Sequence, residues 1–202
     1  MKTRDFAKKA IQEQIALAAL RRFQKNGFEN TTVEDIANDM EMSTRTYFRY
    51  FRSKDDVLLG PIQSFASRFL EIFGENLCSL DLWSSLEIAL GESALNCEKF
   101  DPSRLGAEMQ VIIRSTPILF AKQLEIIERL QIEATDLYFA KYASAGKINW
   151  GTANAIIRSG FSCLHALQSG NPTHAEGEMA LSQLRQLMLE LRPNILTQFQ
   201  SR

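Results

Sequence analysis

Apolar residues recur every three or four positions along almost the whole chain of 202 residues. This spacing marks one face of an α-helix, whereas a half-buried strand alternates apolar and polar residues one by one. No stretch shows four or more alternating positions bounded by hairpin turns. We therefore expect an all-α fold of about nine helices.

Length and composition limit the classes of protein to which the chain can belong. The chain is long enough for one large or two small domains, and 45% hydrophobic residues can bury a real core. No window approaches the roughly 18 uninterrupted apolar residues that a membrane span requires. The first residues, Met1–Asp5, run into charged sequence, which does not resemble a signal peptide. We expect a soluble chain in the cytoplasm, with no membrane partner.

The cysteines do not suggest a covalent framework. Cys78, Cys97 and Cys163 are an odd number at no metal-like spacing, so we expect neither a disulfide framework nor a metal site. Reduced thiols are the simplest interpretation. A redox-sensing cysteine stays an alternative, although none has a basic residue immediately beside it in the sequence.

Helix stop and cap signals divide the first 55 residues into short helical segments. A first helix over about residues 4–25 ends at Asn26-Gly27, where glycine supplies a left-handed stop. Thr32 is typical of an N-cap, with Asp35 three residues on as its capping-box partner, and predicts a short helix over about 32–39.

Ser43 then caps a third short helix, in which Tyr47 and Phe51 lie one turn apart and should face inward. The order is helix, tight turn, helix. Further helices are predicted over about residues 54–74, 102–114, 117–143, 149–169 and 174–191. Pro61 predicts a kink, or a break at Gly60-Pro61, in the first of these. Asp101-Pro102 and Thr116-Pro117 are typical helix starts.

The stretch around these short helices resembles the TetR (tetracycline-repressor-like) family over roughly residues 8–60. The matching elements are Gly27-Phe28, Thr31-Thr32, Ile36-Ala37, Ser43, Phe48-Arg49-Tyr50-Phe51 and Lys54. The resemblance implies a three-helix helix-turn-helix DNA-binding domain over residues 1–53 and a helical effector-binding and dimerisation domain over 54–202. It also implies a sequence-specific transcriptional regulator, a repressor that a small, largely hydrophobic effector releases from an inverted-repeat operator.

Three positions depart from the family pattern. Glu41 stands where the family has a turn glycine, so its backbone must avoid a positive φ or accept a cost of about 1 kcal/mol. Arg45 stands where a glycine is common, two residues after the capping serine. Tyrosine is more usual where Phe48 stands.

The predicted DNA contacts lie on and beside the third helix. Its first turn can enter a major groove, where Arg45 could contact a guanine through two hydrogen bonds, worth about 1–3 kcal/mol of discrimination. The resemblance implies the wider set Thr32, Thr44, Arg45, Thr46, Phe48, Arg49, Tyr50 and Lys54. Residues 1–56 hold 11 Lys and Arg against 9 Asp and Glu, compared with 12 against 15 in the remainder. A solvated basic face is the alternative interpretation of these cations.

The second half offers two further sets. Apolar residues at helical spacing near the C-terminus predict a four-helix homodimer interface made by Ile156, Ile157, Leu164, Leu167, Leu184, Leu187, Met188 and Leu191. Candidate effector contacts are Phe65, Phe69, Trp83, Met109, Phe120, Leu124, Tyr138, Trp150, Phe161 and His165.

Enzymatic function has little support. The chain has no Gly-rich phosphate loop, no Gly-x-Ser-x-Gly elbow and no His-Glu-x-x-His motif, and His165 and His174 are its two histidines. We therefore predict no enzymatic activity, no cofactor and no metal. A DNA-binding or adaptor protein whose second domain only dimerises remains an alternative.

Overall fold

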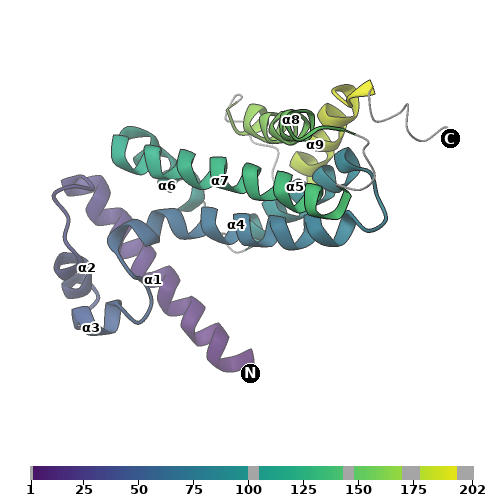
Figure 1. Cartoon of the computed structure of the whole chain (residues 1–202). Coiled ribbons are helices and arrows are strands. Elements are labelled where there is room, and N and C mark those ends of the chain that lie inside the picture. The colour runs from purple at the N-terminus through teal and green to yellow at the C-terminus, as the bar shows by residue number, and fades with distance from the viewer. Residues whose placement is uncertain (1, 100–104, 143–147, 170–177, 195–202) are drawn as a thin grey trace. The chain divides into compact units, whose positions relative to one another are not determined.

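The computed structural model describes residues 2–99, 105–142, 148–169 and 178–194. Across these ranges the regular structure is helical and contains no strand, which confirms the all-α prediction (Figure 1). The helices are α1 (Lys2–Asn26), α2 (Val33–Asp39), α3 (Thr44–Tyr47), α4 (Lys54–Asn76), α5 (Leu82–Lys99), α6 (Leu105–Ser115), α7 (Pro117–Tyr142), α8 (Trp150–Ser169) and α9 (Glu178–Glu190). None of these helices combines the length and apolarity that crossing a bilayer needs.

The chain forms two compact units. Unit 1 comprises Met1–Gln63 and Asp101–Leu124, and unit 2 comprises Ser64–Phe100 and Glu125–Arg202. Helices α4 and α7 therefore contribute residues to both units. The domain boundary predicted between residues 53 and 54 stays a prediction, because units grouped by packing need not coincide with domains.

Unit 1 is built around one face of α1. Ile15, Ala19 and Phe23 on this helix are buried, and α1 packs against both α2 and α6, while α2 packs against α3 (Figure 1). Ile36 of α2 and Tyr47 of α3 complete the small core from the other side. The short helix α2 is thereby held on the long α1, and α3 is held on α2, since neither could bury enough surface alone.

Unit 2 has a larger apolar core. Helices α5, α8 and α9 pack pairwise against one another, and the rings of Phe69 and Phe161 meet with centroids 5.1 Å apart. Trp83 is wholly buried and donates its indole N–H to the Met188 carbonyl at 2.8 Å. A Cβ on Gly91 would stand 2.4 Å from Leu181 Cδ1, so the backbone of α5 lies against the α9 side chain there.

Most predicted helix boundaries are confirmed. Gly27 has φ +82°, the left-handed stop expected after α1, and Pro117 begins α7. Of the two alternatives predicted at Gly60-Pro61, the break is wrong, because α4 continues through Pro61, and the kink stays a prediction. Residues 57–59, which precede Gly60-Pro61, are buried, and this packing offsets the loss of one backbone hydrogen bond. The predicted start at Asp101-Pro102 lies outside the described residues.

The predicted dimer interface needs correction. Ile156, Ile157, Leu184 and Met188 belong to the core of unit 2, and Leu164, Leu167 and Leu187 pack against that core from partly buried positions. Leu191 alone of the set is largely exposed. Helices α8 and α9 bury part of their apolar stripes against each other and α5 within one chain, so the four buried side chains are not free to face a partner. A dimer contact by Leu164, Leu167, Leu187 and Leu191 stays a prediction.

Candidate nucleic-acid interface

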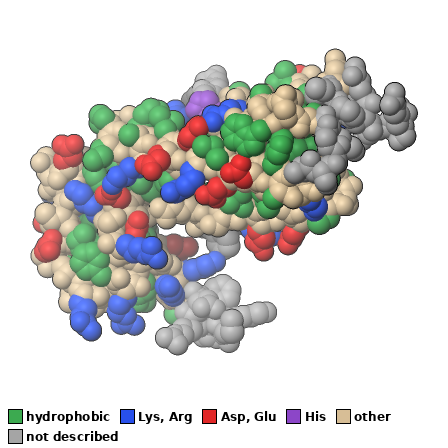
Figure 2. Space-filling view, in the orientation of Figure 1, with side chains coloured by type: hydrophobic (Ala, Val, Ile, Leu, Met, Phe, Trp, Pro, Cys, Tyr) green, Lys and Arg blue, Asp and Glu red, His purple; other side chains and the backbone are tan. Residues whose placement is uncertain are grey.

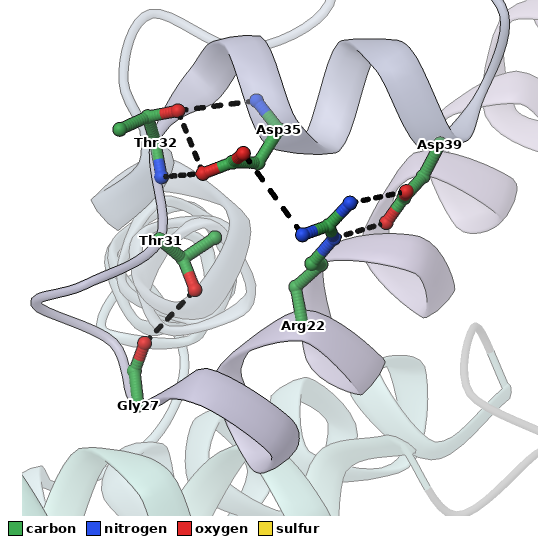
Figure 3. Close-up of polar contacts among 6 residues, drawn as sticks. All are labelled: Arg22, Gly27, Thr31, Thr32, Asp35 and Asp39. Carbon is green, nitrogen blue, oxygen red and sulfur yellow. Dashed lines mark hydrogen bonds and ion pairs between the residues drawn. The ribbon is translucent and has the colours of Figure 1, made fainter.

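Helix α2 begins with a complete capping box. Thr32 Oγ1 accepts from the Asp35 N–H at 3.1 Å, and the Asp35 carboxylate accepts from the Thr32 N–H at 2.9 Å and from its hydroxyl at 2.8 Å (Figure 3). The two hydrogen bonds that Thr32 donates to this carboxylate, first from its backbone N–H and then from its hydroxyl, lower the pKa of Asp35. The predicted cap is confirmed, and both donors of Thr32 are already occupied within the chain.

Arg22 joins α1 to α2. Its Nε and Nη2 donate to the two oxygens of Asp39 at 2.5 and 2.6 Å, and Nη1 lies 3.9 Å from Asp35 (Figure 3). Hydrogen bonding to Arg22 lowers the pKa of Asp39. This arginine therefore positions α2. Its partner Asp39 lies 17 residues further along the chain, so no local sequence pattern indicated this role.

The turn between α2 and α3 is a Schellman motif. The Met42 N–H donates to Ala37 O at 3.0 Å and the Glu41 N–H donates to Asn38 O at 3.1 Å. Glu41 takes φ +51°, the only non-glycine residue among those described with a positive φ. The glutamate therefore adopts the conformation for which glycine is favoured, at a cost of about 1 kcal/mol.

Helix α3 is short and firmly capped. Ser43 Oγ accepts from the Thr46 N–H at 3.1 Å and lies 2.9 Å from Thr46 Oγ1. Tyr47 is wholly buried and donates its hydroxyl to Ser53 O at 3.1 Å. Burial, followed by the charges of Asp56 and Asp55, raises the pKa of Tyr47, so it stays a donor. Its predicted packing role is confirmed.

The outer face of α3 and the turn after it carry uncommitted side chains. Arg45 and Arg49 are exposed, and neither guanidinium has a hydrogen bond or ion pair with another described residue. Phe48 is 52% exposed, while Thr44 and Tyr50 are half-buried. Figure 2 shows Lys and Arg side chains gathered at the end of unit 1 that carries α3. We call Thr44, Arg45, Phe48 and Arg49 the α3 face.

The arginines of the two units differ in whether they form ion pairs. The arginines described in unit 2 each pair with a carboxylate; they are Arg68, Arg129, Arg158, Arg185 and Arg192. Among the described side chains of unit 1, Arg22 is the one arginine that does so. The basic side chains of the α3 face are therefore left available for an external anion.

Lys54, in contrast, is turned inward. Its Nζ donates to the carbonyls of Phe28, Glu29 and Thr31 at 2.7, 3.3 and 2.8 Å, and lies 4.4 Å from the centroid of the Phe28 ring. An ammonium has three donors, and all three are used. The predicted phosphate contact by Lys54 is therefore incompatible with this arrangement, because no donor remains.

The candidate effector contacts fall into separate groups. Phe69, Trp83, Tyr138 and Phe161 belong to the core of unit 2, and Phe65 packs against it. Met109, Phe120 and Leu124 belong to unit 1. His165 and Trp150 are exposed on α8. Effector binding by these residues stays a prediction.

One spatial neighbour could not be seen in the sequence. Lys141 Nζ lies 2.7 Å from Sγ of the exposed Cys78, although 63 residues separate them. No cysteine has a basic residue immediately beside it in the sequence, but Cys78 has one beside it in the folded structure. Of the other cysteines, Cys163 is buried, and burial raises its pKa. Cys97 lies among residues whose side chains are not described.

Comparison with known proteins agrees with this geometry. Residues 15–60 match the family described as bacterial regulatory proteins, tetR family. The chain is also 44% identical over 125 residues to the HTH-type transcriptional regulator TcmR of Streptomyces glaucescens. That match covers 59% of this chain and 55% of the relative, so it spans little more than half the length of each. Both descriptions are of transcriptional regulators, in agreement with the prediction that the chain is not an enzyme.

Solved structures share the fold at low sequence identity. The fatty acid degradation regulator FadR of Bacillus halodurans is 18% identical with a TM-score of 0.56, over 89% of this chain and 93% of that one. A transcriptional regulator from Aquifex aeolicus VF5 is 16% identical with a TM-score of 0.56, over 89% and 96%. The segment that carries the capped helices is therefore similar to the family of bacterial regulatory proteins, tetR family, over residues 15–60.

Proposed function

We propose that this chain binds an inverted-repeat operator as a homodimer and controls transcription, acting as a repressor. The observation that supports this most strongly is the unpaired state of Arg45 and Arg49 on the α3 face, in a chain whose described arginines in unit 2 all pair with carboxylates. Unpaired guanidinium groups on a capped helix suit phosphate and base edges.

Within the α3 face the proposed roles differ. Arg45 lies in the first turn of α3 and reads a base, with Thr44 beside it bonding a base edge or packing on a thymine methyl. Arg49 and the exposed ring of Phe48 contact the sugar-phosphate backbone, and Tyr50 and Thr46 support them there. Thr32 contributes through the placement of α2, because its donors are already used by Asp35.

A homodimer presents this face twice. Two recognition helices related by a twofold axis contact half-sites about 34–36 Å apart, roughly one turn of DNA. Since the buried faces of α8 and α9 are covered by their own chain, the pairing surface uses the exposed residues of these helices. Met179 and Leu189 of α9 are large apolar side chains of this kind.

The proposed effector is a small, largely hydrophobic molecule. The aromatic side chains Phe65, Phe69, Trp83, Tyr138 and Phe161 gather in or against one core in unit 2, which supports an apolar ligand better than a highly charged one. Effector binding shifts the population toward a form with lower operator affinity. Operator dissociation measured against candidate molecules tests this step, and an effector that binds without changing operator affinity contradicts it.

A binding selection on genomic DNA fragments tests the proposed function itself. The purified full chain should enrich fragments that share an inverted repeat, with half-sites centred about 10 base pairs apart. Sedimentation of the protein with the enriched fragment should give two subunits per site or a multiple of two. Failure to enrich any fragment at low salt, or recovery of a single asymmetric half-site bound by one subunit, would refute the proposal.

A further inference from the structure

The ammonium of Lys54 sits in a cage of backbone carbonyls. The acceptors belong to Phe28, Glu29 and Thr31, in the loop between α1 and α2, and the Phe28 ring lies beneath the nitrogen. Without Lys54, the carbonyls of Glu29 and Thr31 would lose the protein donor that the structure shows for them. Three donors radiating from one nitrogen match this cage, whereas the planar fork of an arginine does not.

The cage connects elements on both sides of the DNA-binding face. Lys54 is the first residue of α4, and the loop that it holds leads directly into the N-cap of α2. The segment just before α4 is tied down as well, since Tyr47 donates to Ser53 O at 3.1 Å and Asp56 accepts from the Arg52 N–H at 2.9 Å. The start of α4 is therefore fixed to the loop before α2 and to the end of α3.

We propose that Lys54 is a positioning residue that sets α2 and α3 in register with the start of α4, and that it does not contact DNA phosphate. This inference rests on the proposed DNA-binding function, because positioning has meaning only for a face that binds DNA. It makes a distinction that can be measured: a phosphate contact contributes to the salt dependence of binding, and a cage inside the protein does not.

The experiment compares Lys54→Met with Arg49→Met in the full chain. The probe is a labelled 30-base-pair duplex of random sequence, which needs no knowledge of the operator. Binding of the unmodified chain to this duplex is measured first. Thermal unfolding gives the Tm, and titrations at several salt concentrations, at a temperature where each variant is folded, give affinity and the slope of log K against log salt.

Lys54→Met should lower the Tm by roughly 4–8 °C, because charge-assisted hydrogen bonds are removed. Its affinity for the duplex should fall several-fold with an unchanged salt slope. Arg49→Met, the matched control from the exposed face, should leave the Tm within about 1 °C. It should reduce the magnitude of the salt slope by about 0.9 for each phosphate that Arg49 neutralises.

Three results would overturn the inference. One is a Lys54→Met protein with the original Tm and a smaller salt slope, which would make Lys54 a phosphate contact. Another is unchanged affinity in a folded Lys54→Met protein, which would leave only a structural role. If Lys54→Met does not fold, Lys54→Arg decides: the same Tm as the unmodified chain would overturn the cage, and a lower Tm with an unchanged slope supports it.

Failure of the proposed function gives a different pattern. If the unmodified chain does not bind the duplex even at low salt, the DNA-binding proposal is refuted, and with it the positioning role. A fall in Tm for both Lys54 variants would then still identify the cage as part of the folded structure.

Discussion

The two units hold their structure by different kinds of contact. In unit 1, residues 27–54 are held largely by polar bonds between near neighbours: the capping box at Thr32, the Schellman turn at Glu41 and the cap at Ser43. Unit 2 depends on side chains that meet from distant parts of the chain, such as Trp83 and Met188. Local polar contacts follow rules of residue type and spacing, whereas the partner of an apolar stripe depends on the whole fold.

The arginines show the same contrast in charge. Unit 2 neutralises its described arginines with carboxylates, as in the two hydrogen bonds from Arg158 to Glu128 at 2.8 and 2.5 Å. Unit 1 leaves Arg45 and Arg49 without such partners among the described residues. Exposed pairs contribute little stability, so the difference matters for what each surface can bind more than for folding.

The largest expected effect tests the core of unit 2. Met188 is wholly buried and its neighbour Leu189 is 65% exposed, so the two form a matched pair. Met188→Ala should lower the free energy of unfolding by about 2–5 kcal/mol, because apolar burial is reduced and a cavity is left behind. Leu189→Ala should change it by less than about 0.5 kcal/mol. Chemical denaturation measures both values.

The oligomeric state sharpens this test. Sedimentation at equal concentrations should show that Leu189→Ala weakens any self-association more than Met188→Ala does among folded molecules. If Met188→Ala instead dissociated the protein while leaving unfolding of each subunit unchanged, the sequence-based assignment of Met188 to a dimer interface would be right.

A smaller effect should depend on pH. Asp81 caps α5 by accepting from the Trp83 and Ser84 N–H groups at 3.0 and 3.2 Å, and it pairs with Arg192 at 2.8 Å. Burial acts to raise the pKa of Asp81, but the bonds from Ser84 and the charge of Arg192 outweigh burial and lower it. A carboxylate with a lowered folded pKa stabilises the fold above its unfolded pKa and loses this contribution as pH falls.

Asp81→Ala should therefore cost about 1–2 kcal/mol at neutral pH. The difference from the unmodified protein should shrink as pH falls through the ordinary aspartate range and below it. Glu92→Ala, at an exposed position on α5, is the control. Unfolding midpoints measured from pH 7 to pH 3 decide, and a difference that grows on acidification would contradict the lowered pKa.

The smallest expected effect is a gain in unit 1. Glu41→Gly should raise stability by about 0.5–1 kcal/mol, because glycine takes the positive φ of this turn without strain. The same substitution at the exposed Glu34, inside α2, should lower stability by about 1 kcal/mol. Thermal unfolding should show stability changes of opposite sign for the two variants. A destabilised Glu41→Gly protein would contradict the positive φ of this turn.

What sequence could predict follows from this comparison. The stop at Gly27, the capping box of Thr32 and Asp35 and the cap at Ser43 were all predicted correctly, because each depends on residues a few positions apart. The cage around Lys54 could not be predicted, since its carbonyls meet the ammonium only when the loop between α1 and α2 lies beside the start of α4.

The same limit explains the errors in unit 2. An apolar stripe shows that a helix face is buried and does not show by what, so Ile157 and Met188 were assigned to a partner subunit when their own chain covers them. The whole of α5 was missed, because no helix was predicted between residues 74 and 102, although Asp81 followed by Ser84 is an N-cap signal of the kind used elsewhere in the chain.

The central claim is that the α3 face reads operator DNA through Arg45. A base-by-base substitution scan of the enriched operator, bound by the unmodified protein and by Arg45→Ala, tests it most directly. Arg45→Ala should lose about 1–3 kcal/mol of discrimination at one base pair of each half-site and keep its preferences elsewhere. An equal loss at every position, or an unchanged pattern of preferences, would contradict the claim.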